Sequence, residues 1–226
     1  MNVVIAIDSF KGSMTSMQAG LSAATGVKRV CKDAHITVCP LADGGEGTVE
    51  ALVSGCNGRM TQVQVTGPAG RPVICPYGII DETHTAIIEM SGAAGMGFAF
   101  LTFCNATLES GFHIVLEETN LEKYVRDADI VITGEGRLDG QTVMGKAPIG
   151  VAGLAKKYNK PVLAFSGCVT KDAIACNAEG IDAFFPILRG VVSLEEAMHT
   201  DNAMTNMTDT VEQVFRTIQT FSSVCK

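Results

Sequence analysis

Short β-branched runs that end at acidic or glycine residues alternate with helical patterns along this chain, and that alternation limits the folds open to it. The first run, residues 3–7, stops at Asp8, and the second, residues 36–41, stops just before Asp43. Thr15 and Gln18 form a capping box that opens a helical pattern between the two runs. Strands that alternate with helices predict an α/β fold with a doubly wound, mostly parallel sheet flanked by helices.

The rest of the chain continues the pattern with one interruption. Further strands are expected at 130–133, 161–165 and 183–187, and helices at 49–53, 121–126, 147–158, 172–179 and 208–222. Between them, the extended segments 60–65, 72–80 and 85–90 are joined by turns, which predicts a small antiparallel meander attached to the sheet. A helix is expected over 92–105. We expect residues 1–226 to form a single α/β domain.

Composition excludes several classes of protein. The chain has 226 residues and a formal net charge of −7, so no basic stripe suits it to nucleic acid. The segment from Met90 to Leu108 is uncharged, but its glycines and polar residues favour a buried helix over a membrane span. The N-terminus lacks signal-peptide features, and the eight cysteines show no paired spacing, which indicates free thiols in a cytoplasmic protein.

The stretch Ile130–Lys146 carries the densest group of candidate site residues. Its buried strand is expected to break into a glycine-rich loop that holds Glu135, Arg137 and Asp139 and closes on Gly145-Lys146. Carboxylates and cations on such a loop are poorly suited to a hydrophobic core and well suited to binding an anion together with its metal ion. The loop matches neither the Walker A pattern nor the dinucleotide fingerprint, and the four histidines are too scattered for a zinc site or a catalytic triad.

Other strand ends add polar residues that should meet at one edge of the sheet. Asp8 with Lys11 reads equally well as a turn or as part of a phosphate or metal site. Asp43-Gly-Gly-Glu46 could be a simple helix cap, although its glycines would let a ligand approach the backbone. Ser166-Gly167 ends a further strand. Ligands of open α/β sheets bind beyond such ends.

Three long segments, residues 3–13, 41–51 and 128–139, together resemble the bacterial glycerate kinase family, in the family's order. Shorter matches lie at Thr66-Gly-Pro68, Gln141-Thr142, Gly145-Lys146-Ala-Pro148 and Lys160-Pro161. The resemblance covers Met1 to about Phe221. It implies ATP- and Mg²⁺-dependent phosphorylation of a hydroxyl of D-glycerate, giving 2-phosphoglycerate or 3-phosphoglycerate, and leaves a homodimer open.

The resemblance also implies roles for individual residues. Catalytic roles fall to Asp8, Lys11, Asp43 and Asp139, with Asp8 and Asp43 as the candidate Mg²⁺ ligands. Substrate or phosphate binding falls to Ser9, Gly44, Gly45, Glu46, Gly134, Glu135, Gly136, Arg137 and Lys146. Among these, Arg137 suits the glycerate carboxylate, because a guanidinium fork matches a carboxylate better than an ammonium does.

The chain departs from the family pattern at residues 90–91. Family members are longer and carry a second domain inserted at this point, whereas here Ile87–Met90 runs directly into Ser91–Gly97. In the family the site lies in a cleft between the two domains. The resemblance therefore leaves an alternative: a domain that binds a ligand or partner without transferring phosphate.

Overall fold

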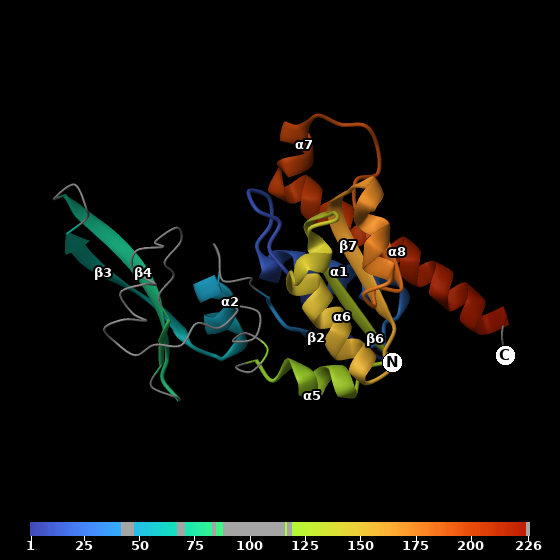
Figure 1. The fold of residues 1–226 in the computed structure, drawn as a ribbon, viewed down its shortest axis with the longest axis horizontal. Coiled ribbons are helices and arrows are strands. Elements are labelled where there is room, and N and C mark those ends of the chain that lie inside the picture. The colour runs from blue at the N-terminus through green and yellow to red at the C-terminus, as the bar shows by residue number, and fades with distance from the viewer. Residues whose placement is uncertain (42–47, 67–70, 83–84, 88–115, 117–118, 225–226) are drawn as a thin grey trace. The chain divides into compact units, whose positions relative to one another are not determined.

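The computed structural model describes residues 1–41, 48–66, 71–82, 85–87, 116 and 119–224. The chain divides into two compact units, one made of residues 1–41 with 120–226 and the other of residues 42–119. In sequence, the second unit is thus inserted into the first. Each unit is described by itself, with elements labelled as in Figure 1.

A five-stranded sheet in the order β2-β1-β6-β7-β8 forms the centre of the first unit. Its strands are β1 (Asn2–Ile7), β2 (His35–Val38), β6 (Ile130–Leu138), β7 (Val162–Val169) and β8 (Ala183–Pro186). Every neighbouring pair is parallel, which confirms the predicted parallel sheet.

Helices cover both faces of this sheet, as Figure 1 shows for the first unit. They are α1 (Ser16–Val30), α5 (Leu121–Arg126), α6 (Ala147–Lys157), α7 (Leu194–Met198) and α8 (Thr200–Val224). α1 and α8 pack together over one face, around a core that includes Ile5, Phe165 and Phe215. α6 packs on the opposite face, against β1, β6 and β7.

Local sequence signals account for several of these boundaries. The expected capping box begins α1: the Thr15 hydroxyl accepts from the Gln18 amide at 3.2 Å, and the Gln18 side chain accepts from the Thr15 amide at 2.9 Å. β2 ends at Val38, before the expected Leu41, close to Pro40, which has no amide to donate. α8 begins at Thr200, eight residues before the predicted start, and its Thr200 hydroxyl donates to the Ser13 carbonyl at 2.7 Å.

The prediction that a loop begins at Gly134 was wrong, because β6 continues to Leu138. Gly134 is paired with Phe165 of β7, and the pairing extends to Leu138 with Val169. A Cβ atom at residue 134 would lie 2.0 Å from the Phe165 carbonyl oxygen. The glycine that suggested a loop therefore permits a close strand pairing, and β7 likewise extends beyond Phe165.

The second unit contains α2 (Thr48–Gly55) and a separate antiparallel sheet. Its strands, β3 (Arg59–Thr66), β4 (Pro72–Ile80) and β5 (Thr85–Ile87), form the predicted meander. The meander forms a sheet of its own and, among the strands described, is not paired with the parallel sheet as we had expected. Gly78 packs under α2, where a Cβ atom would lie 2.5 Å from Val53.

Two predicted features lie outside the described residues: the helix at 92–105 and the uncharged segment 90–108 that contains it. In the part of the chain that is described, no helix combines the length and apolar character needed to cross a membrane.

Two short 3₁₀ helices complete the first unit, η1 (Thr142–Met144) and η2 (Lys171–Asn177). η2 replaces most of the α-helix expected at 172–179, and its Asp172 side chain accepts a hydrogen bond from the Gly140 amide.

Candidate functional site

The candidate site lies where the strand order of the parallel sheet reverses direction. From β1 the chain moves to β2 on one side, and the later strands follow from β6 on the other. Such a switch point is where open α/β sheets bind ligands, beyond the carboxyl ends of the strands. Ile7 is paired with Gly134 and Glu135 with Ser166, so Asp8, Glu135 and Ser166 lie in one row at this edge.

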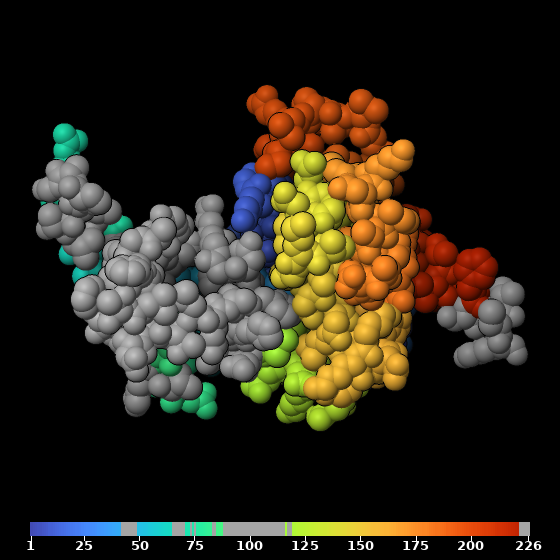
Figure 2. Space-filling view, viewed as in Figure 1, coloured from blue at the N-terminus to red at the C-terminus, as the bar shows by residue number. Residues whose placement is uncertain are grey.

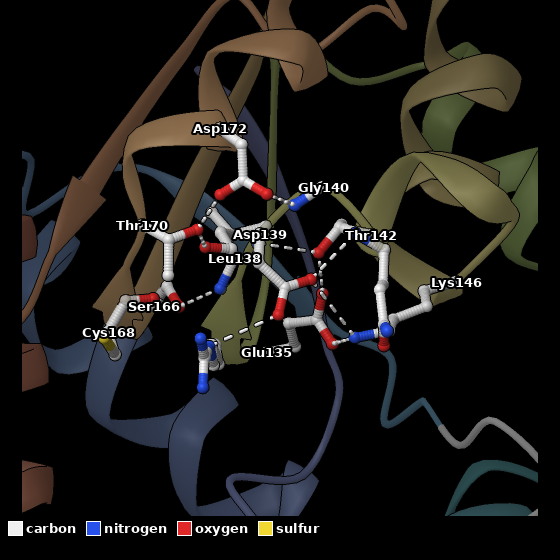
Figure 3. Close-up of polar contacts among 12 residues, drawn as sticks. Glu135, Leu138, Asp139, Gly140, Thr142, Lys146, Ser166, Cys168, Thr170 and Asp172 are labelled. Atoms are coloured by element: carbon white, nitrogen blue, oxygen red, sulfur yellow. Dashed lines mark hydrogen bonds and ion pairs between the residues drawn. The ribbon is translucent and has the colours of Figure 1, made fainter.

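Four of the predicted residues form one cluster of charges, and Figure 3 labels three of them, Glu135, Asp139 and Lys146. Lys146 Nζ lies 3.5 Å from Glu135 Oε2 and 3.9 Å from Asp139 Oδ1, and Arg137 Nε lies 3.3 Å from Asp139 Oδ2. Two carboxylates thus face two cations. The side chains of Lys146 and Arg137 remain 37% and 64% exposed, so both cations can still reach a ligand in solvent.

Glu135 is the most buried carboxylate of the cluster, with 8% of its surface exposed. Burial raises the pKa of Glu135, and nearby Asp139 adds to that rise, while the Thr142 hydroxyl and Lys146 oppose it. Its partners are therefore needed to hold the ionised form in a poorly hydrated place. Thr142 Oγ1 donates to Glu135 Oε1 at 2.7 Å.

The turn after β6 is fixed by hydrogen bonds from β7 and η2 (Figure 3). The Leu138 amide donates to Ser166 Oγ at 3.0 Å, and the Gly140 amide donates to Asp172 Oδ2 at 3.0 Å. Thr170 Oγ1 donates to Asp172 as well, and these bonds hold the pKa of Asp172 below its usual value. In Figure 2 the segments around residue 145 (yellow) and residue 170 (orange) lie side by side on the surface.

Asp8 and Lys11 lie on the loop after β1. Asp8 is buried, its amide donates to the Gly134 carbonyl at 2.9 Å, and its Oδ1 accepts from the Ser9 amide at 2.7 Å. Lys11 is exposed in the turn between Phe10 and Met14. A Cβ atom on Gly136 would lie 3.5 Å from Phe10 Cα and 3.8 Å from the Lys11 amide, so this loop packs against β6 at Gly136.

The remaining predicted residues, Asp43, Gly44, Gly45 and Glu46, lie outside the described part of the chain. The sequence placed Ser166 at the ligand-binding edge of the sheet but assigned no site role to Thr142, Thr170 or Asp172. The side chains of all four hold the cluster by hydrogen bonds. Their only signal in the sequence was position, since Ser166 ends a strand and Thr142 follows Gln141 in a family motif. Within the described ranges, no group of three or more histidine, cysteine or acidic side chains could hold a metal ion.

Comparison with known proteins identifies the family. A model of the glycerate kinase family matches residues 3–96 and 90–219. Glycerate kinase of Bacillus subtilis (strain 168) is 27% identical over 354 positions, covering 87% of this chain and 93% of the relative. Glycerate 2-kinase of Escherichia coli (strain K12) is 25% identical, with the same coverage of both chains.

Two further matches agree. Glycerate kinase of Bacillus cereus is 47% identical over 111 residues, which cover 49% of this chain and 29% of the relative. A crystal structure from Salmonella typhimurium LT2, provisionally identified as glycerate kinase 2, has the same fold, with a TM-score of 0.82 at 24% identity over 99% of each chain. Because the Bacillus subtilis alignment runs over 354 positions and this chain has 226 residues, a long part of that relative has no counterpart here. The chain belongs to the glycerate kinase family.

Proposed function

We propose that this protein transfers the γ-phosphoryl group of Mg·ATP to a hydroxyl of D-glycerate, giving 2-phosphoglycerate or 3-phosphoglycerate. One observation carries the proposal: Glu135, Arg137, Asp139 and Lys146 converge at the switch point of the sheet. Phosphoryl transfer requires positioning and charge neutralisation more than covalent chemistry. A partly exposed pair of cations held by carboxylates meets that requirement. A cytoplasmic location is part of the same proposal.

The cations are proposed to bind the phosphates and the glycerate carboxylate. Lys146 is the residue directly before α6, so it can bind a phosphate together with the positive end of the helix dipole. Arg137 is the more exposed of the two and presents a planar fork, which suits the glycerate carboxylate. Lys11 on the neighbouring loop would add a third positive charge.

Carboxylates are proposed to hold Mg²⁺ and accept the hydroxyl proton. In enzymes that act on nucleotides, Mg²⁺ is usually held by one or two carboxylates together with water and phosphate oxygens. Asp8, with Asp43, would supply such ligands. The ion would offset charge on the transferred group. Asp139, with its side chain 17% exposed, is our candidate acceptor for the hydroxyl proton.

The test is ADP formation with Mg·ATP and D-glycerate, with the product identified by ³¹P NMR. Lys146→Met should lower kcat/KM by about 100-fold or more, as expected for loss of a group that stabilises transition-state charge. Asp8→Asn and Lys11→Met should also be impaired. Lys157→Met is the matched control, since Lys157 ends the same helix but pairs with Glu122 at 2.6 Å. Wild-type turnover in Lys146→Met would refute the site assignment.

A second candidate function is ligand binding without transfer. It is favoured by the long part of the curated relatives that has no counterpart in this chain. Calorimetric titration with D-glycerate and with Mg·ADP distinguishes the two. Binding of either ligand, with no ADP formed over hours at high enzyme concentration, would support the binding domain, whereas turnover excludes it.

A further inference from the structure

Thr142 connects three parts of the candidate site. Its hydroxyl donates to Glu135 Oε1 at 2.7 Å and accepts from the Asp139 amide at 3.1 Å. Its own amide donates to the Asp139 carbonyl at 3.0 Å, and its carbonyl accepts from the Lys146 amide at 3.3 Å. One residue of η1 thus bonds the end of β6, the turn that follows it and the residue before α6, as Figure 3 shows.

Burial makes the hydroxyl group difficult to replace. Thr142 is 0% exposed and Glu135 is 8% exposed, so water has little access to take over a lost hydrogen bond. A buried acceptor without its donor has lost its hydration and has no hydrogen bond to compensate for that loss, which destabilises the folded state. With the Thr142 donor present, Glu135 has one oxygen fixed and the other directed to Lys146.

We infer that Thr142 is a positioning residue: its hydroxyl orients Glu135 and the Asp139 turn and, through them, sets the place of the Lys146 ammonium group. The inference rests on the proposed phosphoryl transfer, in which Lys146 meets a phosphate. Thr142 itself need not touch substrate. Misplacement of a charged group by about 1 Å can lower a rate about 100-fold, so the effect on catalysis should exceed the effect on the fold.

Two substitutions at the same position isolate the hydroxyl. Thr142→Val keeps the shape and removes the hydroxyl, while Thr142→Ser keeps the hydroxyl and removes the methyl group. Thr142→Val should lower kcat/KM for Mg·ATP about 10- to 100-fold, and Thr142→Ser should restore it to within about threefold of wild type. Thr208→Val is the matched control, because Thr208 is also buried, and its hydroxyl donates to Ser22 at 2.9 Å, between α8 and α1.

A double-mutant cycle tests whether Thr142 acts through Glu135. In a Glu135→Ala background, which removes the acceptor of the Thr142 hydroxyl, Thr142→Val should cost much less than it does in the wild type, since residues acting as a unit are not additive. Full additivity would overturn the inference. So would a Thr142→Ser enzyme as impaired as Thr142→Val, which would assign the effect to packing of the methyl group.

Hydrogen exchange separates this inference from the proposed function. The Asp139 amide donates to Thr142 Oγ1, so it should exchange faster in Thr142→Val and at the wild-type rate in Thr142→Ser. Unchanged exchange in Thr142→Val overturns the positioning role. If the wild-type protein forms no ADP, the proposed function fails, and the exchange comparison still decides whether the hydroxyl holds the turn.

Discussion

Replacing Gly134 with alanine should destabilise the protein more than an ordinary change of one methyl group. The new Cβ atom would lie 2.0 Å from the carbonyl oxygen of Phe165, which is 0% exposed and belongs to the adjacent strand. An ordinary van der Waals contact at this atom pair begins at 3.4 Å. β6 and β7 would therefore have to separate by more than an ångström at the middle of the sheet.

The size of the effect follows from what must move. Overpacking a core costs about 1–3 kcal/mol when side chains can adjust, and here the obstacle is backbone, so we expect the upper end, about 3 kcal/mol. In a chain of 226 residues each kcal/mol lowers Tm by about 2–4 °C. The predicted decrease is therefore about 6–12 °C.

Gly153→Ala provides a control of opposite sign. Gly153 is an exposed residue inside α6, and a Cβ atom there would meet nothing within 4 Å. Alanine favours a helix interior over glycine by about 1 kcal/mol, so Tm should rise by about 2–4 °C. Both variants are measured by thermal and urea unfolding, followed by circular dichroism. A Gly134→Ala protein within about 0.5 kcal/mol of wild type would refute the argument.

Three other variants test separate parts of the molecule. Burial raises the pKa of the Glu135 carboxyl group above its usual 4.5, so the folded state favours the protonated form. The stability gained from protonation is fully present below the usual pKa and is lost as pH rises through the raised pKa of the folded state. Glu135→Gln should thus resist urea better than wild type at pH 7, with the gap closing toward pH 4.5, and a less stable variant at pH 7 would contradict the sign. Asp172→Ala should speed hydrogen exchange of the Gly140 amide, which loses its 3.0 Å acceptor, and unchanged exchange would show that this bond does not fix the turn. Gly26→Ala places a Cβ atom 2.4 Å from the Thr208 carbonyl oxygen and should cost about 1–3 kcal/mol in urea unfolding by forcing α1 away from α8; an unchanged midpoint would mean that the helices separate freely.

Periodicity predicted the architecture because each strand of the parallel sheet is a short apolar run with a polar or glycine end. The prediction from periodicity was wrong where a glycine could mark either a turn or a close contact between strands. Gly134 and Gly136 were interpreted as loop residues, yet both lie in β6. At Gly134 the missing side chain admits the Phe165 carbonyl oxygen. A sequence pattern cannot separate these uses without knowing which strand lies alongside.

Only part of the candidate site could be predicted, because some of its residues are recognised only through their neighbours in the fold. Charged residues such as Glu135 and Lys146 attract notice in a sequence, and they do lie together. The hydroxyls and the exposed carboxylate that hold them are common in ordinary loops. Thr142 is seven residues from Glu135, and the turn after β6 brings the two together. Asp172 is 32 residues from Gly140, and only the pairing of β6 with β7 shows that it belongs to the same site.

The position of β1 inside the sheet affects how the chain can fold during its synthesis. β1 is paired with β2 and also with β6, which begins at Ile130, and α1 packs against α8, which begins only at Thr200. While the ribosome is still adding residues 42–119, β1 has only β2 as a sheet neighbour, and α1 can pack on β1 and β2 but not yet on α8. Domains fold as units during synthesis, and the first unit lacks the packing of α1 on α8 until α8 has been made. We therefore expect a ribosome-bound chain stopped before α8 to be more sensitive to protease within residues 1–41 than the full-length protein, because the α1–α8 packing is missing.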